Sequence, residues 1–220
     1  MLLAALAAFW PQYLSKLGRP LDIYTHLHAA VGTAWILLLI VQPLAIRRGA
    51  LVLHRRMGRA SLVLAPAFVM SGVLLAHHRF SRLNAQTFAQ EAFTLYLPLL
   101  VAALFALAYG LGLLQRRRRA VHSRLMACTL ILLIDPVLGR LMYFNLPPFP
   151  GLLWYQAITF SVMGVLVVLL LRSLPATAPG YAAVATFAGV ALAGLALWFV
   201  VPPTVPWLQF ATWFRGLPLT

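Results

Sequence analysis

The chain has 220 residues, of which 63% are hydrophobic and only 9% are charged, and its formal net charge at pH 7 is +14. A soluble domain usually carries about 25% charged residues, so this chain cannot cover a water-facing surface. The composition therefore excludes a soluble enzyme, a disordered tail and a nucleic-acid-binding domain. It predicts an all-α fold, a polytopic transmembrane helix bundle in a single membrane domain.

Residues 1–24 precede the first long apolar stretch and are predicted to lie on the membrane surface. The apolar run Met1–Trp10 is too short to span a bilayer and stops at Pro11. A cleaved signal peptide begins with positive charge, but no cation precedes Lys16. We interpret the run as a short interfacial helix with its aromatic side chains at head-group depth. A seventh short span is the alternative interpretation.

Six later stretches are apolar over roughly 20 residues, the length that a spanning helix needs. They are Thr25–Ile46, Ala60–His78, Ala92–Leu114, Leu125–Phe144, Leu152–Leu171 and Tyr181–Val201. The first four form a predicted core of two helical hairpins over residues 25–144, and two further spans follow over residues 152–201. The aromatic-rich residues 202–220 are predicted to form a second interfacial segment.

Most arginines fall in alternate connections between these spans. Those in the first, third and fifth connections are Arg47, Arg48, Arg55, Arg56, Arg59, Arg116, Arg117, Arg118, Arg119, Arg124 and Arg172. Cationic loops stay in the cytoplasm and attract anionic lipid. We therefore expect these loops to be cytoplasmic, both termini to lie outside, and the chain to reside in a bacterial inner membrane. Its expected partners are the bilayer and anionic lipid, not nucleic acid.

Four histidines are predicted to gather at the opposite end of the bundle. His26 and His28 begin the first span, and His77 and His78 end the second. Imidazoles on adjacent helices can face each other across a gap that holds a haem or a transition metal ion. All four are candidate cofactor-binding residues, for haem b or a transition metal, and His26 and His77 are the candidate metal ligands. Histidines bonded to head groups, water and each other are the alternative interpretation.

Two carboxylates accompany those histidines. Asp22 precedes His26 by four residues, and Glu91 opens the third span on the same side. A carboxylate one helical turn from an imidazole can accept its second ring N–H and thereby fix its tautomer. We therefore assign Asp22 and Glu91 supporting roles around the candidate cofactor site.

Opposite charges lie inside the fourth predicted span. Asp135 stands in an apolar run, and Arg140 follows five residues later. Charged groups within a membrane are costly, so they are candidates for function. We interpret them as a buried charge pair, which serves either as an ion pair that locks the bundle or as a proton relay or substrate site. An ideal helix separates the two by roughly 140°, a poor angle for pairing unless Pro136 bends the helix.

His54 and His122 lie at the arginine-rich end, and each is followed two positions later by an arginine. If imidazoles from consecutive hairpins meet there, they form a candidate inner site. Loop ends that face solvent or lipid are the alternative interpretation. His54 and His77 are 23 residues apart, nearly the whole membrane at about 1.5 Å per residue. This spacing argues against two stacked haems.

Short motifs over roughly residues 35–145 resemble a family of bacterial multi-pass membrane proteins of unknown function. They are Gln42-Pro-Leu-Ala-Ile-Arg47, the HR-x-x-GR element in Leu53-His-Arg-Arg-Met-Gly-Arg59, His122-Ser-Arg-Leu-Met126 and Asp135-Pro-x-x-Gly-Arg140. The HR-x-x-GR element also resembles a loop of cytochrome b561-like and ferric-reductase-like proteins, which implies haem binding. This chain lacks the regularly spaced, paired histidines of those haem proteins.

Two hypotheses of function follow. The first is a small b-type haem or metal redox protein with an outward-facing histidine-rich site. The second is a cofactor-free transport or assembly subunit that uses Asp135 and Arg140. No nucleophile–base pair and no phosphate-cradling loop stands out in the sequence.

The first prediction concerns orientation. Whole-cell labelling with a membrane-impermeant thiol reagent should reach a cysteine introduced near residue 86, because the arginine-rich loops are expected to be cytoplasmic. The same reagent should miss cysteines introduced into the loops Arg47–Arg59 and Arg116–Arg124. External labelling of the run Arg116–Arg119 would reverse the predicted orientation.

Overall fold

The computed structural model describes residues 1–145 and 152–220, and every regular element in these ranges is a helix. The elements are α1 (Leu2–Phe9), η1 (Leu14–Lys16), α2 (Ile23–Arg47), α3 (Leu51–Ser81), α4 (Ala85–Glu91), η2 (Ala92–Leu95), α5 (Tyr96–Leu114), α6 (Arg119–Ile131), α7 (Ile134–Asn145), α8 (Leu152–Arg172), α9 (Tyr181–Leu197) and α10 (Val205–Arg215). The predicted all-α bundle is confirmed.

Five helical segments are long and apolar enough to cross a membrane. They are Ile23–Arg47, Leu51–Ser81, Ala85–Leu114, Arg119–Asn145 and Trp154–Arg172. The sixth predicted span corresponds to α9, which has only 17 residues and ends four residues before the predicted boundary. At about 1.5 Å per residue α9 is roughly 25 Å long, slightly less than a typical hydrocarbon core. The chain is thus an integral, multi-pass membrane protein.

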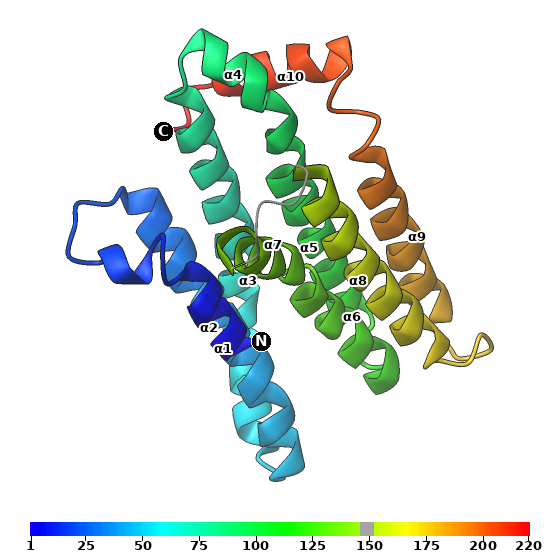
Figure 1. Ribbon diagram of the computed structural model, residues 1–220. Coiled ribbons are helices and arrows are strands. Elements are labelled where there is room, and N and C mark those ends of the chain that lie inside the picture. The colour runs from blue at the N-terminus through cyan, green and yellow to red at the C-terminus, as the bar shows by residue number, and fades with distance from the viewer. Residues whose placement is uncertain (146–151) are drawn as a thin grey trace.

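The long helices run up and down, so their connections gather at two ends (Figure 1). The α2–α3, α5–α6 and α8–α9 connections share one end, which carries the arginines of the odd-numbered loops and is called the arginine-rich end. The short α4 and the transverse α10 lie at the other, which we call the histidine end. At the tight α2–α3 turn, Gly49 adopts a φ of 69°, a conformation that a side chain disfavours.

An aromatic cluster joins α2, α3, α5 and α6 at the centre of the bundle. The Trp35 and Phe105 side chains are completely buried, and their ring centroids are 4.9 Å apart. Tyr109 and Phe68 extend the cluster, at 5.5 Å from Trp35 and 4.6 Å from Phe105. The Trp35 indole N–H donates to the Thr129 hydroxyl at 3.2 Å. Every polar group of this tryptophan is therefore satisfied inside the apolar core.

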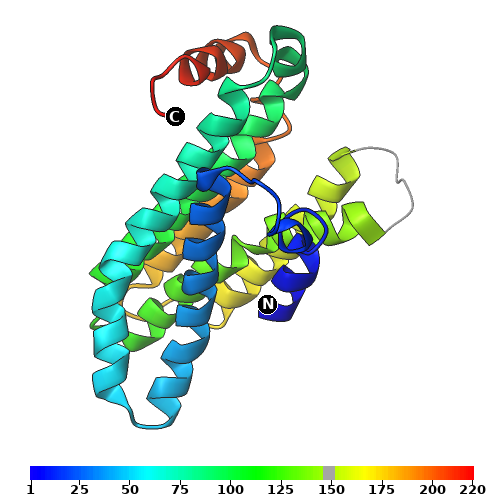
Figure 2. The same cartoon turned by 90° about the vertical axis from the view of Figure 1, so that its left-hand side faces the viewer.

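The fourth predicted span, Leu125–Phe144, is a broken helix rather than a single one. α6 ends at Ile131 and α7 begins at Ile134, with a turn at Leu132 and Leu133. Pro136 lacks the N–H that would continue α6, but a proline is tolerated in the first turn of a new helix. α7 and the beginning of α8 consequently project from the side of the bundle (Figure 2).

The N-terminal helix packs beside this projecting pair. α1 contacts α7, and its Ala5 and Ala8 are buried, whereas Leu3 and Trp10 are 81% and 61% exposed. Small residues face the protein and large apolar residues face outwards. This polarity suits a helix between protein and lipid, and α1 also supplies part of the wall around α7.

Truncating the central tryptophan tests the importance of the aromatic cluster. Trp35→Ala should lower the free energy of unfolding by about 3 kcal/mol, since it leaves a cavity and removes the hydrogen bond from the indole to Thr129. Denaturant unfolding of the purified protein measures the change. The matched control Trp213→Ala removes a tryptophan that is 59% exposed and should change stability by less than about 1 kcal/mol. Equal losses in both variants would contradict this account of the core.

Candidate functional site

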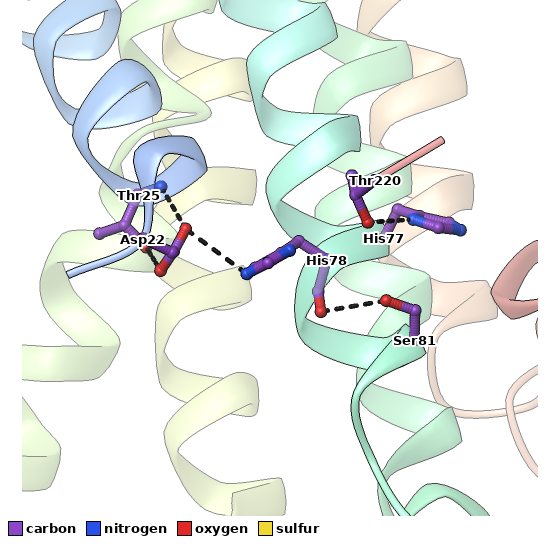
Figure 3. A network of polar contacts seen from close by, with 6 residues as sticks. All are labelled: Asp22, Thr25, His77, His78, Ser81 and Thr220. Carbon is purple, nitrogen blue, oxygen red and sulfur yellow. Dashed lines mark hydrogen bonds and ion pairs between the residues drawn. The ribbon is translucent and has the colours of Figure 1, made fainter. Parts of the chain in front are cut away.

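Asp22 joins the histidine ends of α2 and α3. As the N-cap of α2, it accepts hydrogen bonds from the Thr25 amide at 2.8 Å and the Thr25 hydroxyl at 2.7 Å. Its carboxylate lies 3.9 Å from Nε2 of His78, whose ring also packs on Tyr24 with centroids 4.6 Å apart. Figure 3 shows His78 reaching across to Asp22. The acid predicted to support His26 therefore faces His78 instead.

The environment of Asp22 favours its charged form. Burial raises the pKa of this carboxyl, but the hydrogen bonds from Thr25 and the neighbouring His78 outweigh burial and bring the pKa below its usual value of 3.8. Asp22 is thus an anion at neutral pH. It is placed to form an ion pair whenever His78 is protonated.

His77 points away from His78, although the two are adjacent in sequence (Figure 3). The Nδ1 atom of His77 lies 2.8 Å from the Thr220 hydroxyl, and its ring packs edge-on against Phe214 of α10. The side chain is almost completely buried, and its Nε2 atom has no hydrogen-bond partner among the described residues. His77 therefore belongs to the contact between α3 and the C-terminal segment.

The other two candidate histidines have separate partners. His28 places Nδ1 3.0 Å from the Ser71 hydroxyl and stacks on Phe68 at 5.0 Å. Because the Ser71 hydroxyl donates to the Phe68 carbonyl, it accepts the Nδ1–H of His28. A Cβ on Gly72 would lie only 3.2 Å from the imidazole. His26 instead lies 3.0 Å from the Tyr13 hydroxyl of the N-terminal segment.

These contacts divide the four histidines among different neighbours. His26 faces the N-terminal segment, His28 the middle of α3, His77 the C-terminal segment and His78 the start of α2. Within the described residues, no group of three or more His, Cys, Asp or Glu side chains is arranged to hold a metal ion. The histidines share one end of the bundle without converging on a common centre.

Glu91 and the two inner histidines have other roles in the structure. Glu91 forms an exposed ion pair with Arg79 at 3.1 Å, a contact that stabilises little. At the arginine-rich end, His122 donates from Nδ1 to the Gly112 carbonyl at 2.9 Å. It also lies within electrostatic range of His54. The Nδ1 atom of His54 is buried without a hydrogen-bond partner among the described residues.

Asp135 has the most enclosed polar environment of the three acidic residues. The residue is 5% exposed and lies in the first turn of α7, where the helix dipole favours negative charge. Its Oδ1 atom accepts hydrogen bonds from the Gln156 amide at 2.9 Å and the Thr159 hydroxyl at 2.7 Å. Two neutral donors of α8 therefore compensate the burial of this carboxyl group.

Arg140 lies in the same region without pairing directly with Asp135. Among the described residues, the ion pairs within 4.0 Å are Asp22–His78 and Arg79–Glu91. Arg140 instead donates from Nη1 to the Pro136 carbonyl at 2.8 Å, and its guanidinium carbon lies 4.6 Å from the centre of the Phe9 ring. The break before α7 therefore does not bring these two described residues into direct contact.

The partners of Asp135 were not predicted from the sequence. Gln156 is an isolated amide in an otherwise apolar helix, and Thr159 follows three residues later on the same face. A polar pair at this spacing inside a spanning segment was a usable signal for a buried partner. The contacts of Phe9 and Thr220, in contrast, depend on tertiary packing and carry no such pattern.

Replacing Asp22 separates its capping role from its charge. Asp22→Ala should lower the free energy of unfolding by about 1 kcal/mol because α2 loses its cap, whereas Asp22→Asn retains a good cap. At neutral pH the Asn variant should be less stable than the wild type, since it lacks the carboxylate charge that Thr25 and His78 stabilise in the folded state. The contribution of the Asp22 charge, full above pH 3.8, should vanish as pH falls through the lower pKa of the folded state. Denaturant unfolding between pH 3 and pH 8 measures both effects, and identical curves for wild type and Asn variant would exclude the His78 contact.

Comparison with known proteins identifies no relative of this chain. No family model, no curated protein and no solved structure matches the chain. Any function must therefore be inferred from the residues and contacts of the chain itself. The resemblance carried by the short loop motifs stays a hypothesis.

Proposed function

We propose that the protein is a small membrane transport protein, or a subunit of a transport or assembly complex, that works without a prosthetic group. Its functional centre is Asp135 at the break between α6 and α7. The single observation that carries this proposal is a carboxyl group, 5% exposed, that two neutral donors hold inside a broken apolar span.

The chemistry of Asp135 supports exchange of a proton or a small cation. Broken helices at membrane depth are tolerated where the freed backbone lies against protein or lines a cavity, and many transporters place their sites at such breaks. Gln156 and Thr159 carry no charge, so they can keep the carboxyl group in place whether it is protonated or ionised. A positively charged partner in contact would instead fix the ionised form.

A redox centre built on the outer histidines is the second candidate function. The observation that favours it is the buried Nε2 atom of His77, which has no partner among the described residues. His26, His28 and His78 would have to leave their present contacts to share a haem or a metal ion with it. A Soret band in the visible spectrum of purified protein would favour this candidate over the first.

The arginine-rich end provides the proposed partner surface. Its eleven arginines have no acidic residue in their loops, because Asp22, Glu91 and Asp135 all lie elsewhere in the chain. We propose that anionic phospholipid head groups of a bacterial inner membrane neutralise this charge from the cytoplasmic side. The same orientation leaves the histidine end and the C-terminus, which lies there (Figure 1), outside.

The central prediction concerns the proton on Asp135. Dicyclohexylcarbodiimide, an apolar reagent that attacks protonated carboxyl groups, should modify Asp135, and modification should decline as the pH rises and the group ionises. Peptide mass spectrometry of the labelled protein in detergent or nanodiscs measures the adduct. Glu91, with its exposed ion pair to Arg79, is the internal control and should react little with this reagent.

Two substitutions extend this test. Asp135→Asn retains an acceptor for Gln156 and Thr159, so the variant should fold, lose the adduct and lose transport. Asp135→Ala leaves both donors unpartnered and should also cost about 1–3 kcal/mol of stability. An Asp135 that stays unmodified at every pH in folded wild-type protein would refute an exchangeable proton.

A further inference from the structure

Arg140 is a partly buried cation in a membrane span, with few partners. In the described part of the chain, its guanidinium group contacts the Pro136 carbonyl through Nη1 and the face of Phe9. Both partners are neutral, and among residues 1–145 and 152–220 no carboxylate lies within 4.0 Å. A charged side chain at this depth normally finds an opposite charge. The present contacts leave the positive charge of Arg140 without one.

The charged groups nearest to Arg140 are occupied by other partners. Arg79, the nearby arginine at the end of α3, already has an acidic partner in Glu91 at 3.1 Å. Asp135 directs Oδ1 to two neutral donors on α8. An anion that reaches this position would therefore meet the uncompensated charge of Arg140 itself.

We infer that Arg140 forms a binding site for an anionic group, a carboxylate or a phosphate attached to an apolar body, which enters between α1 and α7. A guanidinium group is planar, and two of its N–H groups match the two oxygens of such an anion. The inference rests on the proposed function, because it names the ligand class for the site beside Asp135. It adds that an anion accompanies the proton or cation bound there.

Phe9 covers the site and can be displaced. It is the last residue of α1, which has eight residues and is fastened beyond Phe9 by the contact between Tyr13 and His26. Leu3 and Trp10 on its outer side are exposed. An amphiphilic anion dissolved in the bilayer would therefore meet α1 first. Its charged group can then replace the aromatic face as the partner of Arg140.

Thermal unfolding in nanodiscs of neutral phosphatidylcholine tests the site. Three probes are compared: sodium hexanoate, inorganic phosphate, and phosphatidylglycerol added to the nanodisc lipid. At saturation at least one should raise the Tm of the wild type by about 3 °C or more. Stabilisation by hexanoate or phosphate identifies a free anion, and stabilisation by phosphatidylglycerol alone identifies a lipid head group. A wild type that none of the three stabilises would overturn the inference.

Variants locate the effect at Arg140. Arg140→Gln should abolish the shift in Tm. The control Arg82→Gln, which removes an exposed arginine at the C-terminal end of α3, should retain it. An equal shift in Arg140→Gln and wild type would overturn the assignment. If the Gln variant does not fold, Arg140→Lys serves instead and should lose at least half of the shift, since an ammonium group cannot bind two oxygens side by side.

A change at Phe9 tests its displacement. Phe9→Leu keeps an apolar cover but removes the aromatic face, so the anion should bind about fivefold more tightly, as measured by titration of the Tm shift. Unchanged affinity would exclude competition between Phe9 and the anion. Asp135→Asn should keep the anion-induced shift while losing carbodiimide reactivity. The anion site and the proposed proton site can thus fail separately.

Discussion

The outer part of this fold depends on the burial of one carboxyl group. Asp135 lies in a span that offers it no water, so its oxygens need donors from the protein itself. Gln156 and Thr159 of α8 provide them. Since both donors are on α8, satisfying Asp135 fixes α7 against that helix. A continuous fourth helix would leave Pro136 inside a long helix; the break at Leu132 and Leu133 places it in a first turn instead.

Further features follow from the position of α7. Once α7 leaves the line of α6, its outer surface needs a cover within the membrane, and α1 supplies one with two buried alanines. Phe9, at the end of α1, then lies over the guanidinium group of Arg140. The two charged residues of the broken span share one region while each keeps its own neutral partners. In the described part of the chain, the two groups therefore form no direct ion pair.

The histidine end shows how proximity along two helices differs from a shared site. His77 and His78 are adjacent in sequence, yet successive residues of a helix point about 100° apart. One therefore meets α10 and the C-terminal segment, and the other meets Asp22 at the start of α2. His28 lies closer to the middle of α3, where Gly72 leaves room for its ring. His28 and His78 both hold α2 against α3, whereas His26 contacts the N-terminal segment and His77 the C-terminal one.

The sequence alone determined the membrane class, the all-α fold and the approximate bounds of most spans, because apolar length and charge depletion are local properties of the chain. It also identified Asp135 and Arg140 as groups that need compensation. Only the tertiary structure decided which partners they have, since hydrogen bonds from α8 and the aromatic face of α1 depend on how distant segments pack. The same holds for Asp22. Its spacing in the sequence predicted a contact with His26, but the packing of α2 on α3 places it beside His78. Helical periodicity fixes which face a residue occupies, and the neighbouring helices determine what that face meets.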